Sequence, residues 1–140
     1  MGLMARMLRN RAGSSAVEFA IIAPIFLLVL LTMIAYGIYL MTAYSVQQVA
    51  ADAARTAIAG LNNNEREALA KDFVSKSALN YAFMDKRYFH VTVGSDLSNS
   101  NQFTVTVEYD ATELPIWSLY SYALPEKTIK RFSTIRIGGV

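Results

Sequence analysis

The stretch that decides the fold spans residues 9–41 and reads RNRAGSSAVEFAIIAPIFLLVLLTMIAYGIYLM. Its last 23 residues, 19–41, contain no charged side chain. At about 1.5 Å per residue, a helix of this length is roughly 35 Å long, which is enough to cross a bilayer with some tilt. Because a helix satisfies its own backbone polar groups in lipid, the stretch predicts a transmembrane helix.

The charges on either side of the apolar run predict its orientation. Three arginines precede it: Arg6, Arg9 and Arg11. Beyond the run, the first charged residue is Asp52. The positive-inside rule therefore places residues 1–13 in the cytoplasm and the chain after the span outside. Three tyrosines near the outer end suit the membrane–water interface, and they are equally compatible with ordinary helix positions: Tyr36, Tyr39 and Tyr44.

A short motif lies between the arginines and the apolar run. Gly13 is followed by small uncharged residues, and Glu18 is the fifth residue after it. This order resembles the prepilin peptidase site of type IV pilins and pseudopilins. The resemblance implies cleavage by a prepilin peptidase between Gly13 and Ser14, with the apolar helix retained on the mature protein. It also implies that Glu18 pairs with the new amino terminus of a neighbouring subunit.

The run SSAVEFAIIAPIFLLVLL narrows this resemblance. Phe19 follows Glu18 directly, and Pro24 stands six residues after the glutamate. The pattern is similar to the TadE-like family, which are pseudopilins of the Tad tight-adherence pilus system. The distinctive similarity covers residues 11–41, and a weaker one continues through VAADAARTAIAG and TVTVEYD.

Membership of this family implies a structural, non-enzymatic minor pilin that takes part in the assembly or initiation of a Flp-type adhesion pilus. Its partners would be the prepilin peptidase, other pilins, the lipid bilayer and an inner-membrane assembly platform with a cytoplasmic ATPase. Glu18 and Phe19 would serve subunit pairing, and the protein would be a single-pass protein of the bacterial inner membrane. The resemblance leaves open whether the protein enters the filament or stays in the membrane.

Other interpretations remain open from the residues alone. A permanent single-span anchor, whose head binds another envelope protein without filament assembly, needs no cleavage at Gly13. A secretory signal cleaved at 51–53 or 57–59 is disfavoured, because signal h-regions have only about 7–15 apolar residues. Glu18 has an alternative too: a carboxylate at the edge of an apolar run is costly without a partner, and it can reach the headgroups instead.

Composition sets further bounds. The 140 residues divide into a leader at 1–13, a transmembrane part at 14–41 and one head domain at 42–140. Three of the 13 basic residues lie in the leader, which leaves ten against eleven acidic residues in the mature chain. The net charge of +2 is therefore a property of the leader, and no nucleic-acid partner is implied. The chain has no cysteine, which excludes disulfides and thiol chemistry.

The first helix is predicted to begin near Ser14 or Ser15, which are good N-cap residues, and to kink at Pro24. No glycine or proline occurs between residues 42 and 59, so the helix should continue for about 45 residues toward Gly60. An apolar stripe at helical spacing should pack on the head: Val46, Val49, Ala50, Ala53 and Ala57.

The rest of the head predicts a small α+β, pilin-like fold. Asn64 should cap a second helix that runs to about Tyr81 or Met84. Alternating residues predict antiparallel strands at 88–94 and 102–109, and a third strand at 127–137 with Ile135 and Ile137 on one side. Residues 110–126, which contain the only tryptophan, predict either a short helix or a packed loop.

The residue types that carry chemistry form no catalytic constellation in the sequence. His90 is the only histidine, and no nucleotide-binding or metalloprotease motif occurs, so no enzyme, metal site or cofactor is expected. A cluster of carboxylates has the spacing of a solvated strand end rather than of a calcium loop: Glu108, Asp110 and Glu113. A group of aromatic residues is interpreted either as core filler or as a binding patch: Tyr109, Trp117, Tyr120 and Tyr122.

Overall fold

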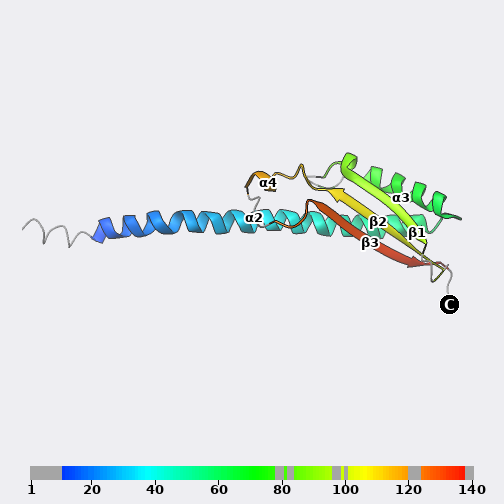
Figure 1. Ribbon diagram of the computed structural model, residues 1–140, viewed down its shortest axis with the longest axis horizontal. Coiled ribbons are helices and arrows are strands. Elements are labelled where there is room, and N and C mark those ends of the chain that lie inside the picture. Colours follow the sequence, from blue (N-terminus) through cyan, green and yellow to red (C-terminus); the bar gives the residue numbers. More distant parts are fainter. Residues whose placement is uncertain are drawn as a thin grey trace, which may run out of the picture.

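The computed structural model describes residues 11–77, 81, 84–95, 99, 101–119 and 124–137. In chain order the elements are α2 (Arg11–Ala57), α3 (Asn63–Ser77), the 3-10 turn η2 (Lys86–Tyr88), β1 (Phe89–Ser95), β2 (Gln102–Asp110), α4 (Ile116–Leu119) and β3 (Thr128–Arg136). Figure 1 shows one long helix whose C-terminal half carries the other elements as a head. The predicted α+β class, with a second helix and a three-stranded antiparallel sheet, is confirmed.

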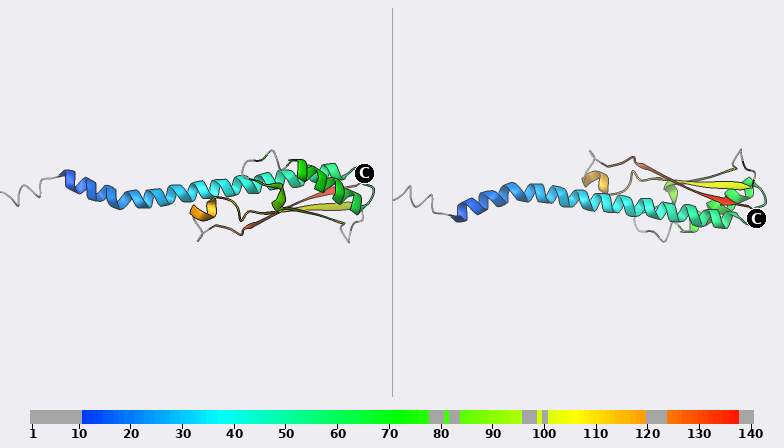
Figure 2. Two further views of the ribbon diagram at one scale, coloured as in Figure 1. Left: turned by 90° about the horizontal axis from the view of Figure 1, so that it is seen from above. Right: turned by 90° about the horizontal axis from the view of Figure 1, so that it is seen from below.

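Helix α2 is continuous over 47 residues, close to the predicted length. It is already helical at Arg11, the first described residue, so the prediction of a start at Ser14 or Ser15 was wrong. The Ser14 hydroxyl does not cap a helix end, because it donates a hydrogen bond to Oε1 of Glu18 at 3.1 Å, one turn further along. Pro24 lies inside the helix, and the N-terminal third of α2 bends in the views of Figure 2. A kink at Pro24 itself stays a prediction.

The sheet has the strand order β1-β2-β3, and both pairings are antiparallel. Val107 of β2 lies between Val91 of β1 and Arg131 of β3 in the register. The odd-numbered residues of β2 are all buried, as its alternation predicted: Phe103, Val105, Val107 and Tyr109. Both α2 and α3 contribute side chains to the core on this face, so the two helices cover one side of the sheet.

The apolar stripe of α2 is the other half of this core. All five of its predicted members are fully buried: Val46, Val49, Ala50, Ala53 and Ala57. Three of them are alanines, whose small side chains let the strands come close to the helix axis. Burying each larger partner, such as Phe103 or Ile129, stabilises the head by about 1.5–3 kcal/mol. Ile135 and Ile137 pack against the edge of this core, as predicted.

Helix α3 differs from its prediction at both ends. Asn62, not Asn64, caps it: its side-chain oxygen accepts the Glu65 N–H at 2.9 Å, while Glu65 accepts the Leu61 N–H. This reciprocal arrangement satisfies donors that the first helical turn leaves free. The helix is described as far as Ser77, and Tyr81 lies in a bend, so the predicted extension to Tyr81 or Met84 was wrong. Residues 62–64 are all asparagines, which are equivalent as caps by residue type, so the sequence alone does not select among them.

Residues 110–126 contain the short helix α4, which was one of the two predicted alternatives. Ile116 of α4 is fully buried, and α4 contacts α2. Of the described parts of the head, α4 lies nearest the N-terminal end of α2 (Figures 1 and 2). The head therefore covers α2 from Ala35 onward, which lies inside the uncharged run of residues 19–41.

Candidate functional site

The residues predicted to carry function lie on the bare N-terminal part of α2. Gly13, Ser14, Glu18 and Phe19 are all exposed, and Phe19 keeps 71% of its surface. They share one continuous helix, so they have a fixed spacing but no enclosing pocket. Arg6 and Arg9 of the predicted leader lie outside the described residues, and Arg11 is the first residue of α2.

Gly13 has no structural partner within the head or the helix. A Cβ atom built at this position would meet nothing within 4 Å. Glycine inside a helix costs about 1 kcal/mol relative to alanine, because it loses more backbone freedom on folding. Nothing in the described part of the chain offsets that cost.

Glu18 has a hydrogen-bond partner but no counter-ion among the side chains described from Gly13 onward. Its carboxylate accepts the bond from Ser14, and no ion pair of these residues includes it. In lipid such a carboxylate is costly unless it reaches water or finds a cation. Glu18 is thus an exposed carboxylate on the helix surface, and Ser14 is its partner among these residues.

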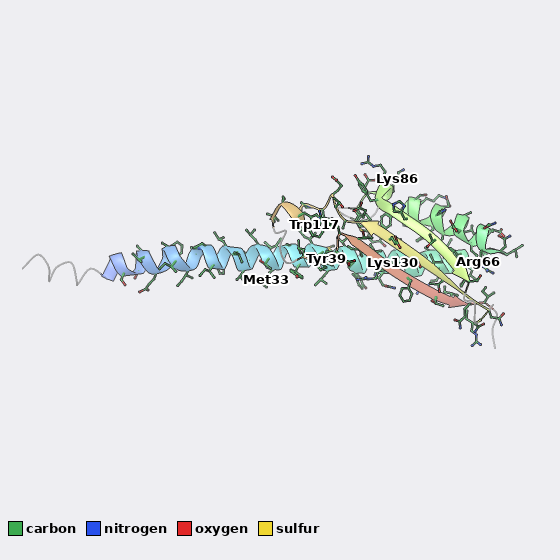
Figure 3. All side chains as sticks on the ribbon, in the orientation of Figure 1. Met33, Tyr39, Arg66, Lys86, Trp117 and Lys130 are labelled. Carbon is green, nitrogen blue, oxygen red and sulfur yellow. The ribbon has the colours of Figure 1, made fainter. Side chains whose placement is uncertain are left out.

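The apolar part of α2 that precedes the head is fully accessible. Large side chains point outward on all sides of the helix between residues 17 and 34, among them Phe26, Leu28 and Met33 (Figure 3). Within the described residues, α2 is the one helix long and apolar enough to cross a membrane. A soluble protein would bury such a surface, so a bilayer is the environment that fits it.

Several charged groups of the head form ion pairs with one another. Lys130 pairs with Glu108 across the β2–β3 register, and Lys71 pairs with Glu67 on α3. The Thr112 hydroxyl and N–H both donate to Asp110, and these bonds lower the pKa of that carboxyl. No group of three potential metal ligands occurs in the described residues. Glu108 and Asp110 are half-buried at the end of β2, and Glu113 beyond them is exposed.

The two described members of the predicted aromatic group, Tyr109 and Trp117, lie in different environments. Tyr109 is buried in the core, and this burial raises the pKa of its hydroxyl. Trp117 is half-buried, and its indole Nε1 donates to the Ala111 carbonyl at 2.6 Å. Tyr120 and Tyr122 lie outside the described residues. His90, on β1, is exposed and borders a shallow groove of about 350 Å³ beside α3, whose Glu67 and Lys71 already satisfy each other.

One contact was not foreseen from the sequence. Tyr39, near the end of the uncharged run, is buried, and its hydroxyl donates to the Glu126 carbonyl at 3.3 Å. The partners are 87 residues apart in the chain, and no local pattern links them. The one feature of the sequence that could have indicated this contact was the aromatic content of residues 116–122 between two prolines, Pro115 and Pro125.

The fold and the exposed helix define a class of protein: an α+β head on a single long apolar helix that suits a single-pass membrane anchor. Residues 13–55 match the family model described as TadE-like protein. The predicted TadE-like resemblance is therefore confirmed, and the matching segment begins at Gly13 and ends within α2. Neither the curated proteins nor the solved structures include a match to the chain.

Proposed function

We propose that the protein is a minor pilin-like subunit of a Tad pilus system, which takes part in the assembly or initiation of an adhesion pilus. One observation carries this proposal: the TadE-like match begins at Gly13, and the N-terminal part of the matched helix presents Gly13 and Glu18 on its exposed surface, away from the head. Helix α2 anchors the protein in the bacterial inner membrane, with the leader in the cytoplasm and the head outside.

The first step of this function is cleavage by a prepilin peptidase between Gly13 and Ser14. Water adds across the peptide bond, which leaves a carboxylate on Gly13 and an ammonium group on Ser14. The bond joins the third and fourth residues of α2 as described, so the helix must unwind there before the peptidase can reach the bond. Glycine makes this unwinding easier, because it is a poor helix former, and it offers the peptidase a backbone without a side chain.

The second step is pairing between subunits. Cleavage places a positive charge on Ser14, the residue whose hydroxyl bonds Glu18 in the uncleaved chain. The ammonium group of one subunit meets Glu18 of another subunit or of a different pilin. At about 4 Å and an effective dielectric constant near 20, two such charges attract by about 4 kcal/mol. Phe19, exposed beside Glu18, packs against the same neighbour, and the assembly platform with its ATPase moves the paired subunits.

N-terminal sequencing of the protein from its native membrane tests the proposal. We expect a mature chain that begins at Ser14. Gly13→Leu should leave a full-length precursor in the membrane, because a branched side chain obstructs the peptidase. Gly37→Leu is the matched control: Gly37 lies in the same helix and, like Gly13, has nothing within 4 Å of a built Cβ. This variant should be processed normally.

Retention of residues 1–13 in the native protein would contradict the proposal. That result would favour a permanent single-span anchor whose head binds another envelope protein. A chain that begins beyond Ala51 would contradict both interpretations, since it would lack the membrane helix.

A further inference from the structure

The position of the head along α2 sets where the membrane surface falls. Residues 14–34 are exposed except for Ala23 and Thr32, which are half-buried. Counted from Glu18 at the membrane edge, the 20 residues 19–38 extend for roughly 30 Å at about 1.5 Å per residue, which matches the hydrocarbon thickness of a bilayer. The outer headgroup layer therefore lies near residues 35–41, at the end of the apolar run.

The head first touches α2 at this level. Ala35 is fully buried and Tyr39 nearly so, and Tyr39 is tied to the Glu126 carbonyl. Helix α4 packs here, and in Figure 3 the labelled Trp117 lies over α2 close to the labelled Tyr39. The head thus stands at the membrane surface with α4 as its lowest described element.

The surface that α4 presents at this level is apolar and aromatic. Leu119 is 45% exposed, and Pro115 and Ser118 beside it are exposed too. The ring of Trp117 is half-covered, while its N–H is already satisfied by the Ala111 carbonyl. Tryptophan and leucine with this partial exposure suit the region between headgroups and acyl chains.

Charge at this end of the head is mixed. Glu113, Glu126 and Lys127 are all exposed, and the Lys127 ammonium group lies 5.5 Å from the centre of the Trp117 ring. Asp110 lies close enough to Lys127, and Arg87 to Glu113, for their charges to interact. These two cations face three carboxylates, so this end of the head has no net positive charge to attract anionic lipid. Contact with a lipid surface must therefore depend on the apolar side chains, and zwitterionic lipid suffices for it.

We infer that the α4 end of the head rests on the outer surface of the same bilayer that α2 spans, with Trp117 and Leu119 at the level of the headgroups. The inference rests on the proposed membrane anchoring of α2. Two attachments, the span and the α4 surface, hold the head at a fixed depth and inclination. Release of a subunit from the membrane then requires both contacts to break.

Trp117 is the only tryptophan, so its fluorescence reports the contact directly. The full-length chain is reconstituted in phosphatidylcholine vesicles whose lipids carry bromine at a shallow or at a deep acyl position. Bromine quenches an indole only at close range. We expect shallow bromine to reduce the emission of Trp117 more strongly than deep bromine does.

Two variants provide matched controls. In the double variant Trp117→Phe, Leu61→Trp, the indole moves to a residue that is 88% exposed and lies beyond the far end of α2, so neither lipid should quench it. Leu119→Glu should reduce the quenching of Trp117 by lifting α4 from the surface. Leu61→Glu, an equal change in charge at the far end, should leave the quenching unchanged.

Carbonate extraction of the same vesicles separates the possible failures. A chain that resists extraction while Trp117 is quenched no more than the tryptophan at position 61 would overturn the contact of α4 with lipid and leave the anchor intact. A chain that carbonate removes from the vesicles would contradict the anchor as well as the contact.

Discussion

At the scale of single residues, Gly13 and Glu18 make few contacts within the subunit. Gly13 fills no tight space, and Glu18 accepts one hydrogen bond at the surface of a bare helix. Elsewhere the chain uses its residues internally: Gly60 fits against Arg66, and Tyr109 fills the core. Residues that a fold does not use are candidates for recognition by other molecules.

Variants of Glu18 test its role in pairing. Glu18→Ala and Glu18→Gln should insert and be cleaved normally, since neither adds a charge at the membrane edge. Both should lose crosslinking to partner pilins and pilus-dependent adherence, because the new ammonium group has no counter-ion. Glu18→Asp should restore part of the adherence, as its carboxylate is one methylene shorter.

Ser14→Ala is the control for this series. It removes the hydroxyl that bonds Glu18 and keeps the amino group that cleavage creates. Adherence should therefore persist in this variant. Normal pili in both Glu18→Ala and Glu18→Gln would show that the carboxylate only reaches the headgroups.

Gly60 carries a structural prediction. A Cβ at this position would lie 2.7 Å from the Arg66 backbone nitrogen and 2.8 Å from Arg66 Cγ. The Arg66 guanidinium lies over the Phe103 ring at 5.0 Å, so the side chain cannot move aside without leaving the core edge. Gly60→Ala should lower the free energy of unfolding by about 1–3 kcal/mol, as for other overpacked sites.

Thermal unfolding followed by circular dichroism measures this loss. Gly94→Ala is the comparison, because a Cβ at Gly94 on β1 meets nothing within 4 Å. An equal midpoint for Gly60→Ala and the parent protein would show that α3 shifts freely relative to the end of α2.

At the scale of elements, α2 is one helix in two environments. Its first part exposes large apolar side chains, and its second part buries a stripe of valine and alanine under the sheet. The stripe followed from helical spacing, and the approximate end of the helix followed from Gly60 and the asparagines after it. Helix at Arg11 was not predicted, because Ser14 is a good N-cap residue but is also acceptable inside a helix, where its hydroxyl bonds a side chain one turn away. The local sequence predicted which helices and strands form more accurately than it predicted the residues at which they begin and end.

At the scale of the whole molecule, the head and the membrane helix overlap. Ala35 and Tyr39 belong to the uncharged run and are also buried against the head. The predicted boundary between transmembrane part and head, at residues 41 and 42, thus lies inside a packed region. The overlap brings α4 to the level at which we place the membrane surface.

The overlap predicts where a soluble head fragment should begin. A fragment that starts at Ala35 keeps the Tyr39 hydroxyl bond to Glu126, whereas one that starts at Ala43 loses it together with the burial of the Tyr39 ring. The shorter fragment should be less stable by about 1–3 kcal/mol. In a domain of this size that difference lowers the melting temperature by roughly 4–8 °C per kcal/mol.

Circular dichroism of both fragments in detergent-free buffer checks the prediction, and both spectra should show mixed helix and strand. Equal melting temperatures would mean that the contact of Tyr39 with the segment before β3 does not stabilise the head.

The sequence by itself determined the features that depend on short range. The uncharged run of residues 19–41 follows from the composition of consecutive residues. The alternation in β2 and the alanine stripe of α2 follow from the strand and helix periods that burial on one face imposes. The order Gly13, Ser14, Glu18 likewise involves neighbouring residues only, and the peptidase site that it indicates stays a prediction. Only the tertiary structure decided that Ala35 and Tyr39 lie under the head, that Trp117 stands beside them, and that Asn62 rather than Asn64 caps α3. These outcomes depend on contacts between segments far apart in the chain, and such contacts leave no periodic trace in either partner.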